Sequence, residues 1–230
     1  MNDVAIEDLT IGVLGGTGAQ GRGLALRWAA SGLDVVLGSR DAERAERAAT
    51  ELNEELSAVS GAATVRGAAN REAAEMADVV LVAVPFDAHL KTLTDLVDVL
   101  EGKIVIDCVN PLGFDKQGAY VLEVEGGSAA EQAQVILTGS RVIGAFHNVS
   151  AVLLGDLSVT DVDTDVLVLG EEREDVALVQ ELADRIPGVR GLFGGRLRNT
   201  GQVEALTANL IAINRRHKTH AGIRITGQGL

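Results

Sequence analysis

The stretch that decides the fold reads Thr10-Ile11-Gly12-Val13-Leu14-Gly15-Gly16-Thr17-Gly18-Ala19-Gln20-Gly21. Its first five residues form a short apolar run with β-branched members, which is typical of a buried strand. Gly16, Gly18 and Gly21 then have the G-x-G-x-x-G spacing of a turn from a strand into a helix. In such a turn the three glycines allow the sharp bend, the approach of a pyrophosphate and the packing of the helix on the strand. A tight turn without a ligand is the alternative, but a strand before the loop and a helix after it favour a bound dinucleotide.

The residues around this loop alternate between helical and strand patterns. Helices are expected at 19–30, 41–56, 70–76 and 88–100, and strands at 34–38, 64–66, 78–84 and 103–107. The strand at 78–84 is apolar after its first residue, which indicates burial on both faces. This rhythm predicts an α/β fold of the Rossmann type, with a doubly wound parallel sheet and right-handed crossovers.

The rhythm is less regular after residue 107. A loop is expected at 110–125, strands at 141–146, 165–169 and 189–193, and helices at 128–136, 172–185 and 199–217. Ser128 is expected to cap its helix, with Glu131 as the capping-box partner. The change of rhythm near residue 150 predicts two domains. They are a nucleotide-binding Rossmann domain at 1–150 and a small C-terminal domain at 151–230 that ends in the long helix and closes the substrate cleft.

Composition and charge exclude several classes of protein. Hydrophobic residues make up 47% of the 230 residues and aromatic residues 3%, so the core is built mainly from Ala, Val, Leu and Ile. The formal net charge of −13 argues against a nucleic-acid partner, because binding to phosphates needs a basic surface. The single cysteine, Cys108, allows no internal disulfide and is expected to pack in the core.

Location and metal binding are also constrained by the sequence. The usage of cysteine fits the cytoplasm, residues 1–8 lack the pattern of a signal peptide, and no apolar run reaches the roughly 18 residues of a membrane span. The four histidines show no ligand pattern with the carboxylates, so no metal site is expected.

The end of the second predicted strand indicates which nicotinamide cofactor binds. An NAD-binding domain usually has an acidic residue there, whereas this chain has Ser39-Arg40. Ser39 can donate a hydrogen bond to a 2′-phosphate, and Arg40 supplies a planar, charged fork. Arg44 lies one helical turn further on, and Thr17 adds a hydroxyl in the loop. The pattern predicts NADP rather than NAD. The alternative for the two arginines is a solvated helix start.

The second reactant is expected at the carboxyl ends of the other strands. Val84, Pro85, Asn110 and His147 follow these strands, and the final helix adds Asn199, Glu204, Asn209 and Asn214. His147 is the best polar candidate beside the reacting rings, where it would position a ring or stabilise charge. Its alternative role is that of a structural histidine at the strand end. We therefore predict that the cofactor is bound by Gly16, Thr17, Gly18, Ala19, Gln20, Gly21, Ser39, Arg40, Arg44, Val84, Pro85 and Asn110.

A basic cluster lies at the end of the final helix pattern. His217, Lys218 and His220 stand there with two arginines, Arg215 and Arg216. The cluster either meets an acidic cofactor tail or forms a solvated helix end, and the sequence does not separate these two possibilities.

Several of these segments together resemble one family, the NADPH-dependent reductases of the deazaflavin coenzyme F420. They are residues 11–18, 21–27, 38–40, 83–86, 146–148 and 204–211. The resemblance covers nearly the whole chain, whereas the glycine loop with Ser39-Arg40 alone is shared by many NADP enzymes. The segment at 107–111 departs from the version expected in archaeal members.

The resemblance implies reversible hydride transfer between NADP(H) and coenzyme F420, the activity of an 8-hydroxy-5-deazaflavin:NADP+ oxidoreductase. It implies that the deazaflavin lies in a cleft between the Rossmann domain and a small C-terminal domain, and that the protein is a cytoplasmic homodimer acting on small molecules. By position, Thr17, Ser39, Arg40 and Arg44 match the 2′-phosphate site, and Val84, Pro85 and His147 match the cleft. Because hydride transfer between stacked rings needs orientation more than acid–base groups, the absence of a catalytic triad fits.

Two alternatives remain open at this stage. One is another NADP-dependent reductase of the imine or pyrroline-carboxylate type, which is disfavoured because only 37 residues follow the last predicted strand at 189–193. The other is a non-catalytic module that binds NADPH.

Overall fold

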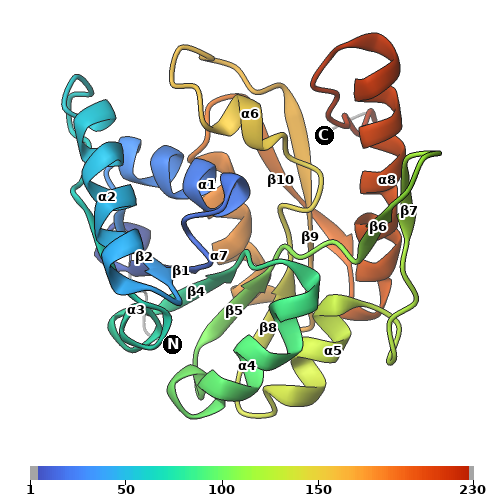
Figure 1. Ribbon diagram of the computed structural model, residues 1–230, viewed down its shortest axis with the longest axis horizontal. Coiled ribbons are helices and arrows are strands. Elements are labelled where there is room, and N and C mark those ends of the chain that lie inside the picture. The colour runs from blue at the N-terminus through green and yellow to red at the C-terminus, as the bar shows by residue number, and fades with distance from the viewer. Residues whose placement is uncertain (1–4, 228–230) are drawn as a thin grey trace.

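The computed structural model describes residues 5–227, in which eight strands form one sheet (Figure 1). The strands lie in the order β10-β9-β8-β5-β4-β1-β2-β3. Their bounds are β1 Thr10–Leu14, β2 Asp34–Ser39, β3 Val65–Ala69, β4 Val79–Val82, β5 Ile104–Asp107, β8 Arg141–Gly144, β9 Thr164–Leu169 and β10 Val189–Gly195. Neighbouring strands are parallel except β8 and β9, which pair antiparallel at Gly144 and Leu169.

Helices cover both faces of this sheet. Their bounds are α1 Ala19–Ala30, α2 Ala42–Leu56, α3 Asn70–Met76, α4 Phe86–Leu100, α5 Ala129–Ile136, α6 Ala151–Leu154, α7 Arg173–Asp184 and α8 Thr200–His217. Apolar residues of α1 and α7 pack on one face, and apolar residues of α4 and α5 pack on the other. On the first face Trp28 meets Phe146 edge to face, with ring centroids 5.5 Å apart. These layers confirm the predicted Rossmann-type α/β fold.

Polar side chains cap the starts of two helices. The carboxylate of Asp41 caps α2 and accepts a hydrogen bond from the backbone N–H of Arg44 at 3.2 Å. The hydroxyl of Ser128 caps α5 and accepts from the backbone N–H of Glu131 at 3.1 Å. The Glu131 carboxylate then accepts from the Ser128 hydroxyl rather than from the Ser128 backbone. The predicted N-cap is therefore confirmed, with a different return bond.

The segment expected to be a loop at 110–125 contains a short hairpin instead. Strand β6, Leu112–Phe114, pairs antiparallel with β7, Ala119–Val121. The turn between them is held by the Asp115 carboxylate, which accepts from the backbone N–H groups of Gln117 and Gly118 at 2.7 and 3.1 Å. Strands of three residues are too short to show the alternation by which strands are found in a sequence.

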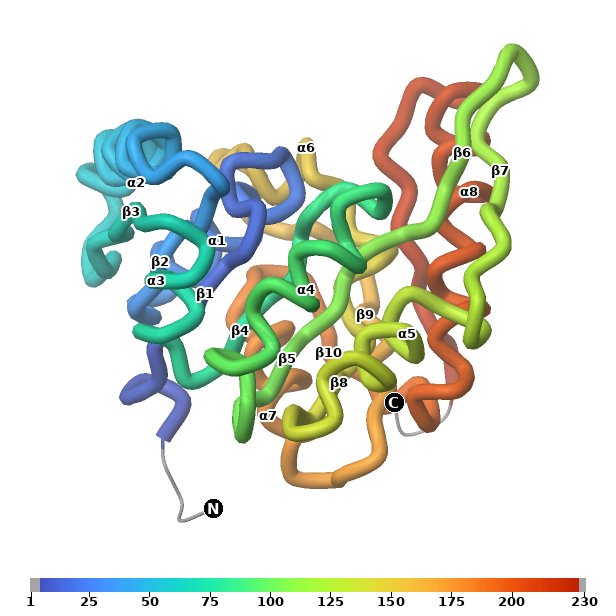
Figure 2. Tube along the Cα trace, turned by 60° about the horizontal axis from the view of Figure 1, so that its bottom comes forward, coloured from blue at the N-terminus to red at the C-terminus, as the bar shows by residue number. Residues whose placement is uncertain are grey.

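Successive strands of the chain are added first on one side of β1 and then on its other side. β2 and β3 lie on one side of β1, and β4 lies on the other side. The loops that leave the carboxyl ends of β1 and β4 therefore run apart and open a crevice between them. In open parallel sheets ligands bind in such a crevice, and Figure 2 shows the helices α1, α2 and α4 that begin there.

The second half of the chain continues the same sheet. β9 and β10 extend it beyond β8, while α8 stands beside α5 and the β6–β7 hairpin, as both views show (Figures 1 and 2). The division into domains at 1–150 and 151–230 stays a prediction. Within residues 5–227 no helix is long and apolar enough to cross a membrane. The expectation of no signal peptide at residues 1–8 falls partly outside the described residues.

Candidate functional site

The turn after β1 accepts little except glycine. Gly15 has a φ of +74°, in the left-handed region that side chains disfavour. A Cβ on Gly16 would lie 2.6 Å from the Leu37 side chain and 2.9 Å from the Val13 carbonyl oxygen. A Cβ on Gly21 would lie 3.0 Å from the Gly16 Cα atom. The predicted close packing of helix, turn and strand is therefore present, and the start of α1 faces the crevice.

A pocket of about 390 Å³ opens over this turn. It is lined by most of the residues predicted to bind the cofactor, namely Thr17, Gly18, Ala19, Gln20, Ser39, Arg40, Arg44, Val84 and Pro85. Gly16 and Gly21 lie behind the pocket wall and shape it. Asn110 and His147 lie outside the pocket, at the ends of β5 and β8. The structure thus brings together the loop, the end of β2 and the segment after β4.

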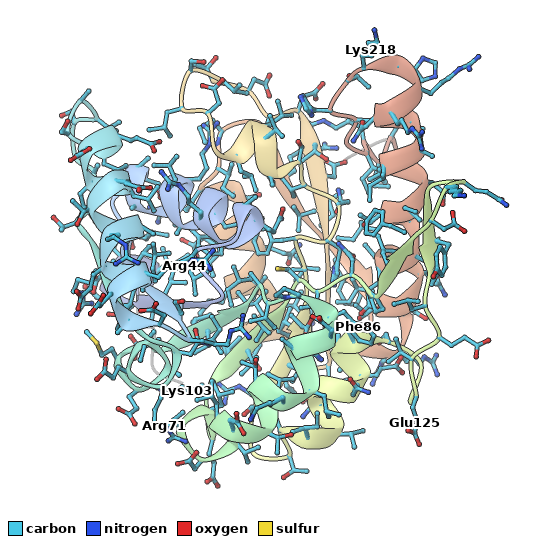
Figure 3. All side chains as sticks on the ribbon, in the orientation of Figure 1. Arg44, Arg71, Phe86, Lys103, Glu125 and Lys218 are labelled. Carbon is cyan, nitrogen blue, oxygen red and sulfur yellow. The ribbon has the colours of Figure 1, made fainter. Side chains whose placement is uncertain are left out.

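The two arginines of this pocket have no partner for their charge. Among the described residues neither Arg40 nor Arg44 forms an ion pair or a side-chain hydrogen bond. The hydroxyl of Ser39 is buried and accepts from the backbone N–H of Asp41 at 3.2 Å, which leaves its proton available as a donor. Figure 3 shows Arg44 on the side of α2 that faces the centre of the molecule. Two unpaired cations and a hydroxyl beside a glycine turn fit a 2′-phosphate.

A second pocket of about 480 Å³ continues the first and shares Ser39, Arg40, Asn70 and two residues of α4 with it. Asn70 lies between the two pockets and was missed by the sequence analysis. Its side-chain oxygen accepts from the backbone N–H of Gly15 at 3.4 Å. A Cβ on Gly38 would approach that oxygen to 2.8 Å, so glycine at the end of β2 makes room for it. An asparagine at the first position of a helix after a strand was the available signal.

His147 is tied into the strand ends through its main chain. The Asn110 amide donates to the His147 carbonyl oxygen at 3.0 Å, and the Thr207 hydroxyl donates to the same oxygen at 2.9 Å. The preceding Phe146 has a φ of 65°, and its carbonyl oxygen accepts from the Gln20 amide at 3.1 Å. These bonds connect β5, β8, α1 and α8 around one point.

The ring of His147 is buried, with 3% of the residue exposed, and both ring nitrogens lack a partner among the described residues. Burial lowers the pKa of His147 to about 4, so the imidazole is neutral near pH 7. The ring therefore does not cap the strand by hydrogen bonding. A neutral ring can donate one N–H but brings no net charge.

A buried polar cluster below these strand ends was not found from the sequence. The Nε2 atom of His89 lies 2.6 Å from a carboxylate oxygen of Asp107, and both side chains are fully buried. Burial lowers the pKa of His89, but the hydrogen bond to Asp107 and its charge, together with Gln132 and Glu204, raise the pKa by more in sum, so the net shift is upward. The other Asp107 oxygen accepts from the backbone N–H of Val109 at 3.0 Å. The sequence assigns His89 no role beyond the absence of a metal-ligand pattern, and its significance comes from the contact with Asp107.

Glu204 joins this cluster from α8. Its carboxylate oxygens accept from the backbone N–H groups of Ala129 and Ala130, at 3.1 and 3.2 Å, and so cap α5. Burial raises the pKa of Glu204 to about 7, although the two N–H groups act in the opposite direction. From the sequence, Glu204 is only one of several polar residues on the final helix. The structure shows that it binds α8 to α5.

Cys108 has the packing position expected of it. The thiol is buried and donates to the Val82 carbonyl oxygen at 3.2 Å. Burial raises the pKa of Cys108 far above its usual range, so the reactive thiolate is absent near neutral pH.

The parallel sheet, the glycine turn at its crevice and the unpaired cations at the end of β2 define a Rossmann-type dinucleotide-binding protein. Residues 10–111 match a family model described as NADP oxidoreductase, coenzyme F420-dependent. The chain is 42% identical over 95% of its length to the F420-dependent NADP reductase of Methanothermobacter marburgensis, 98% of which is covered. It is 39% identical, with the same coverage of both chains, to the enzyme of that name from Methanocaldococcus jannaschii.

The chain therefore belongs to the family of F420-dependent NADP reductases, and the resemblance seen in the sequence is confirmed. A solved structure agrees with this assignment. It is a protein from Arthrobacter sp. FB24 assigned by name to the F420-dependent NADP reductases. It has a TM-score of 0.78 and 26% identity over 95% of this chain and 100% of that chain.

Proposed function

We propose that this protein is an oxidoreductase that transfers a hydride reversibly between NADP(H) and coenzyme F420. The observation that carries the proposal is the 42% identity to a reductase of that name over almost the full length of both chains. The matched length extends over α8 and the strand ends, and not only over the nucleotide-binding turn that many NADP enzymes share. NADPH supplies the hydride, and the deazaflavin ring of F420 accepts it.

The residues of the chain bind and orient the nucleotide. The backbone N–H groups at the start of α1 bind the pyrophosphate, and Ser39, Arg40 and Arg44 bind the 2′-phosphate. Val84 and Pro85 form a wall of the pocket. These contacts fix the nicotinamide end near the termini of β5 and β8, where transfer depends on orientation.

Asn110 and His147 position this end of the site. The Asn110 amide and the Thr207 hydroxyl both hold the His147 carbonyl oxygen, so they fix the loop after β8 relative to α8. Because the His147 ring is neutral and buried, it can act beside a bound ring as an N–H donor but not as a cation.

Assembly as a homodimer and a place in the cytoplasm also belong to this proposal. The family resemblance supports the dimer, and the single buried cysteine fits a reducing compartment. The measurements that test them are the molar mass in solution and the fractionation of cells. A monomer, or a protein found outside the cytoplasm, would contradict these two points alone.

The proposal is tested by following the deazaflavin absorbance band while NADPH is supplied with F420. We expect turnover with NADPH and much slower turnover with NADH. Arg40→Ala should weaken NADPH binding by about tenfold to a hundredfold, because one charge-assisted contact contributes roughly 1.5–3 kcal/mol. The binding of NADH should change little.

Arg47→Ala is a matched control on the same helix, because Arg47 is exposed and its partner is Glu43, at 3.6 Å. It should leave the affinity for both nucleotides unchanged. No change of absorbance with either nucleotide would refute the proposed transfer. Equal losses for NADPH and NADH in Arg40→Ala would refute the 2′-phosphate assignment.

A further inference from the structure

Most cations of this acidic chain have a partner within the protein. Among residues 5–227, the arginine and lysine side chains that bind carboxylates or backbone carbonyl oxygens are Arg22, Arg27, Arg47, Arg66, Arg71, Lys91, Lys103, Arg141, Arg185, Arg190, Arg196 and Arg224. With a net charge of −13, carboxylates are plentiful near almost any cation. A group of cations without a partner is therefore unusual.

The cations without a partner gather at two places. Arg40 and Arg44 are at the cofactor pocket, where the ligand supplies the negative charge. The second place is a groove of about 690 Å³ between the β6–β7 hairpin and the last turns of α8, lined by Lys116, Arg215 and Arg216. Beyond these two places, Arg173 and Arg198 are single exposed cations on other elements.

The groove has a positive wall on each side. Lys116 comes from the turn of the hairpin, and Arg215 and Arg216 come from α8, while Phe114 and Ile211 provide apolar surface. The carboxylate that also lines the groove, Asp115, accepts hydrogen bonds from two N–H groups of its own turn. Figure 3 shows Lys218 at the end of α8, beyond the residues that line the groove.

The helix end explains only part of this cluster. Cations in the last turn of α8 interact favourably with the helix dipole. That effect does not account for Lys116, which lies on a separate element across the groove. Because exposed like charges repel one another, their convergence on one groove favours an anionic ligand.

The groove is continuous with the site along one side of α8. Thr207, whose hydroxyl holds the His147 carbonyl oxygen, is followed at intervals of four residues by Ile211 and Arg215. With a rise of 1.5 Å per residue, Arg215 lies about 12 Å from Thr207 along the helix. A flexible chain that leaves the strand ends could reach the groove over that distance.

We propose that this groove binds the anionic tail of the deazaflavin co-substrate, which carries phosphate and carboxylate groups. The inference rests on the proposed function for the identity of the ligand. Lys116, Arg215 and Arg216 contact the tail, and Phe114 and Ile211 provide apolar surface beside those contacts. The ring of the co-substrate is held separately, at the ends of β5 and β8.

The test compares two probes, coenzyme F420 and the same deazaflavin riboside without its phosphate and carboxylate tail. Binding is followed by deazaflavin fluorescence without NADPH, and turnover is measured separately with NADPH. The variants are Arg215→Gln/Arg216→Gln on one wall and Lys116→Gln on the other. Arg173→Gln is the control, because Arg173 is an exposed cation without a partner on α7, outside both sites.

We expect the double variant to bind F420 about tenfold more weakly, as for two exposed charge pairs, and to bind the tailless probe within a factor of about two of the original protein. Lys116→Gln should show the same selectivity with a loss of about threefold. The affinity of the original protein for F420 should fall with added salt, while its affinity for the tailless probe should not. Arg173→Gln should match the original protein with both probes.

Two results would overturn the groove assignment. One is an equal loss for both probes, which indicates an effect on the ring or the fold. The other is no change in the binding of either probe, which would indicate that these cations interact with the end of the helix and not with a ligand. If tail-dependent binding occurs without any turnover, the hydride-transfer proposal fails and the groove assignment stands. If neither probe binds, both proposals fail.

Discussion

Replacing Glu204 by glutamine should change how the stability of the protein depends on pH. This carboxyl is 2% exposed and caps α5 through two backbone N–H groups. Burial raises its pKa from 4.5 to about 7, with the charge of Asp107 acting in the same direction and His89 and the two N–H groups acting against it. Between pH 4.5 and about 7 the Glu204 carboxyl therefore keeps its proton in the folded protein, whereas it is ionised in the unfolded chain.

The sign of the effect follows from this difference. Because the folded state binds more protons between pH 4.5 and 7, the free energy of unfolding falls as the pH rises through that range. A shift of about 2.5 units at roughly 1.36 kcal/mol per unit gives a total of about 3 kcal/mol. Between pH 5 and pH 8 the part that appears is about 2.5 kcal/mol. Glutamine does not titrate, so the difference between the two proteins should change by that amount.

The assay is urea unfolding followed by far-UV circular dichroism at pH 5, 6, 7 and 8, for the original protein and Glu204→Gln. Relative to the variant, the original protein should lose stability steadily as the pH rises. A second variant, Glu204→Ala, removes both acceptors and leaves the N–H groups of Ala129 and Ala130 unsatisfied, each at about 1–3 kcal/mol. If the free energies of unfolding of the original protein and Glu204→Gln differ by the same amount at every pH in this range, the raised pKa of Glu204 is refuted. A difference that grows with pH would show that the helix cap outweighs burial.

Three further substitutions test the framework of the site. Gly16→Ala should weaken NADPH binding by about a hundredfold, because its methyl group would lie 2.9 Å from the Val13 carbonyl oxygen and so displace the backbone of the turn, and unchanged affinity would contradict this. Arg27→Met should lower the free energy of unfolding by about 3 kcal/mol in urea, because the guanidinium donates to four backbone carbonyl oxygens near α6. Arg224→Gln should expose the C-terminal segment to limited proteolysis, because Arg224 binds Asp165 and the backbone of Gly188, and an unchanged cleavage pattern would count against that anchoring.

The parts of the fold that the sequence predicts are those encoded by neighbouring residues. The glycine turn, the Ser39-Arg40 pair and the cap at Ser128 each depend on residues within a few positions, so their meaning can be read locally. The long apolar strands also follow from their pattern. The β6–β7 hairpin does not, because its strands are short and its turn depends on the single side chain of Asp115.

The buried cluster of His89, Asp107 and Glu204 could not be predicted from the sequence, for a second reason. His89 and Asp107 are 18 residues apart, and Glu204 lies 75 residues beyond the N–H group of Ala129 that it binds. Nothing near any one of these residues distinguishes it from an ordinary polar position in a helix or at a strand end. Their meaning comes from burial, which makes an unpaired polar group costly and so requires a partner. The topology of the sheet, which brings β5 under α4 and α5, supplies that partner.

Whether a cation has a partner also depends on residues that are far apart in the sequence. In a chain with 33 acidic and 20 basic residues, an acidic side chain is available to pair with a cation that has no role in binding a ligand. Arg40 stands before the start of α2 and Arg215 stands in the last turn of α8, and both lack a partner in the structure. An exposed ion pair adds little stability, so leaving one unmade costs little, whereas a ligand phosphate or carboxylate gains a strong contact with an arginine that is not already engaged. We therefore infer that the two groups of unpaired cations lie at opposite ends of one binding site. The group with Arg40 binds the 2′-phosphate of the nucleotide, and the group with Arg215 binds the tail of the co-substrate. The nicotinamide and deazaflavin rings meet between them.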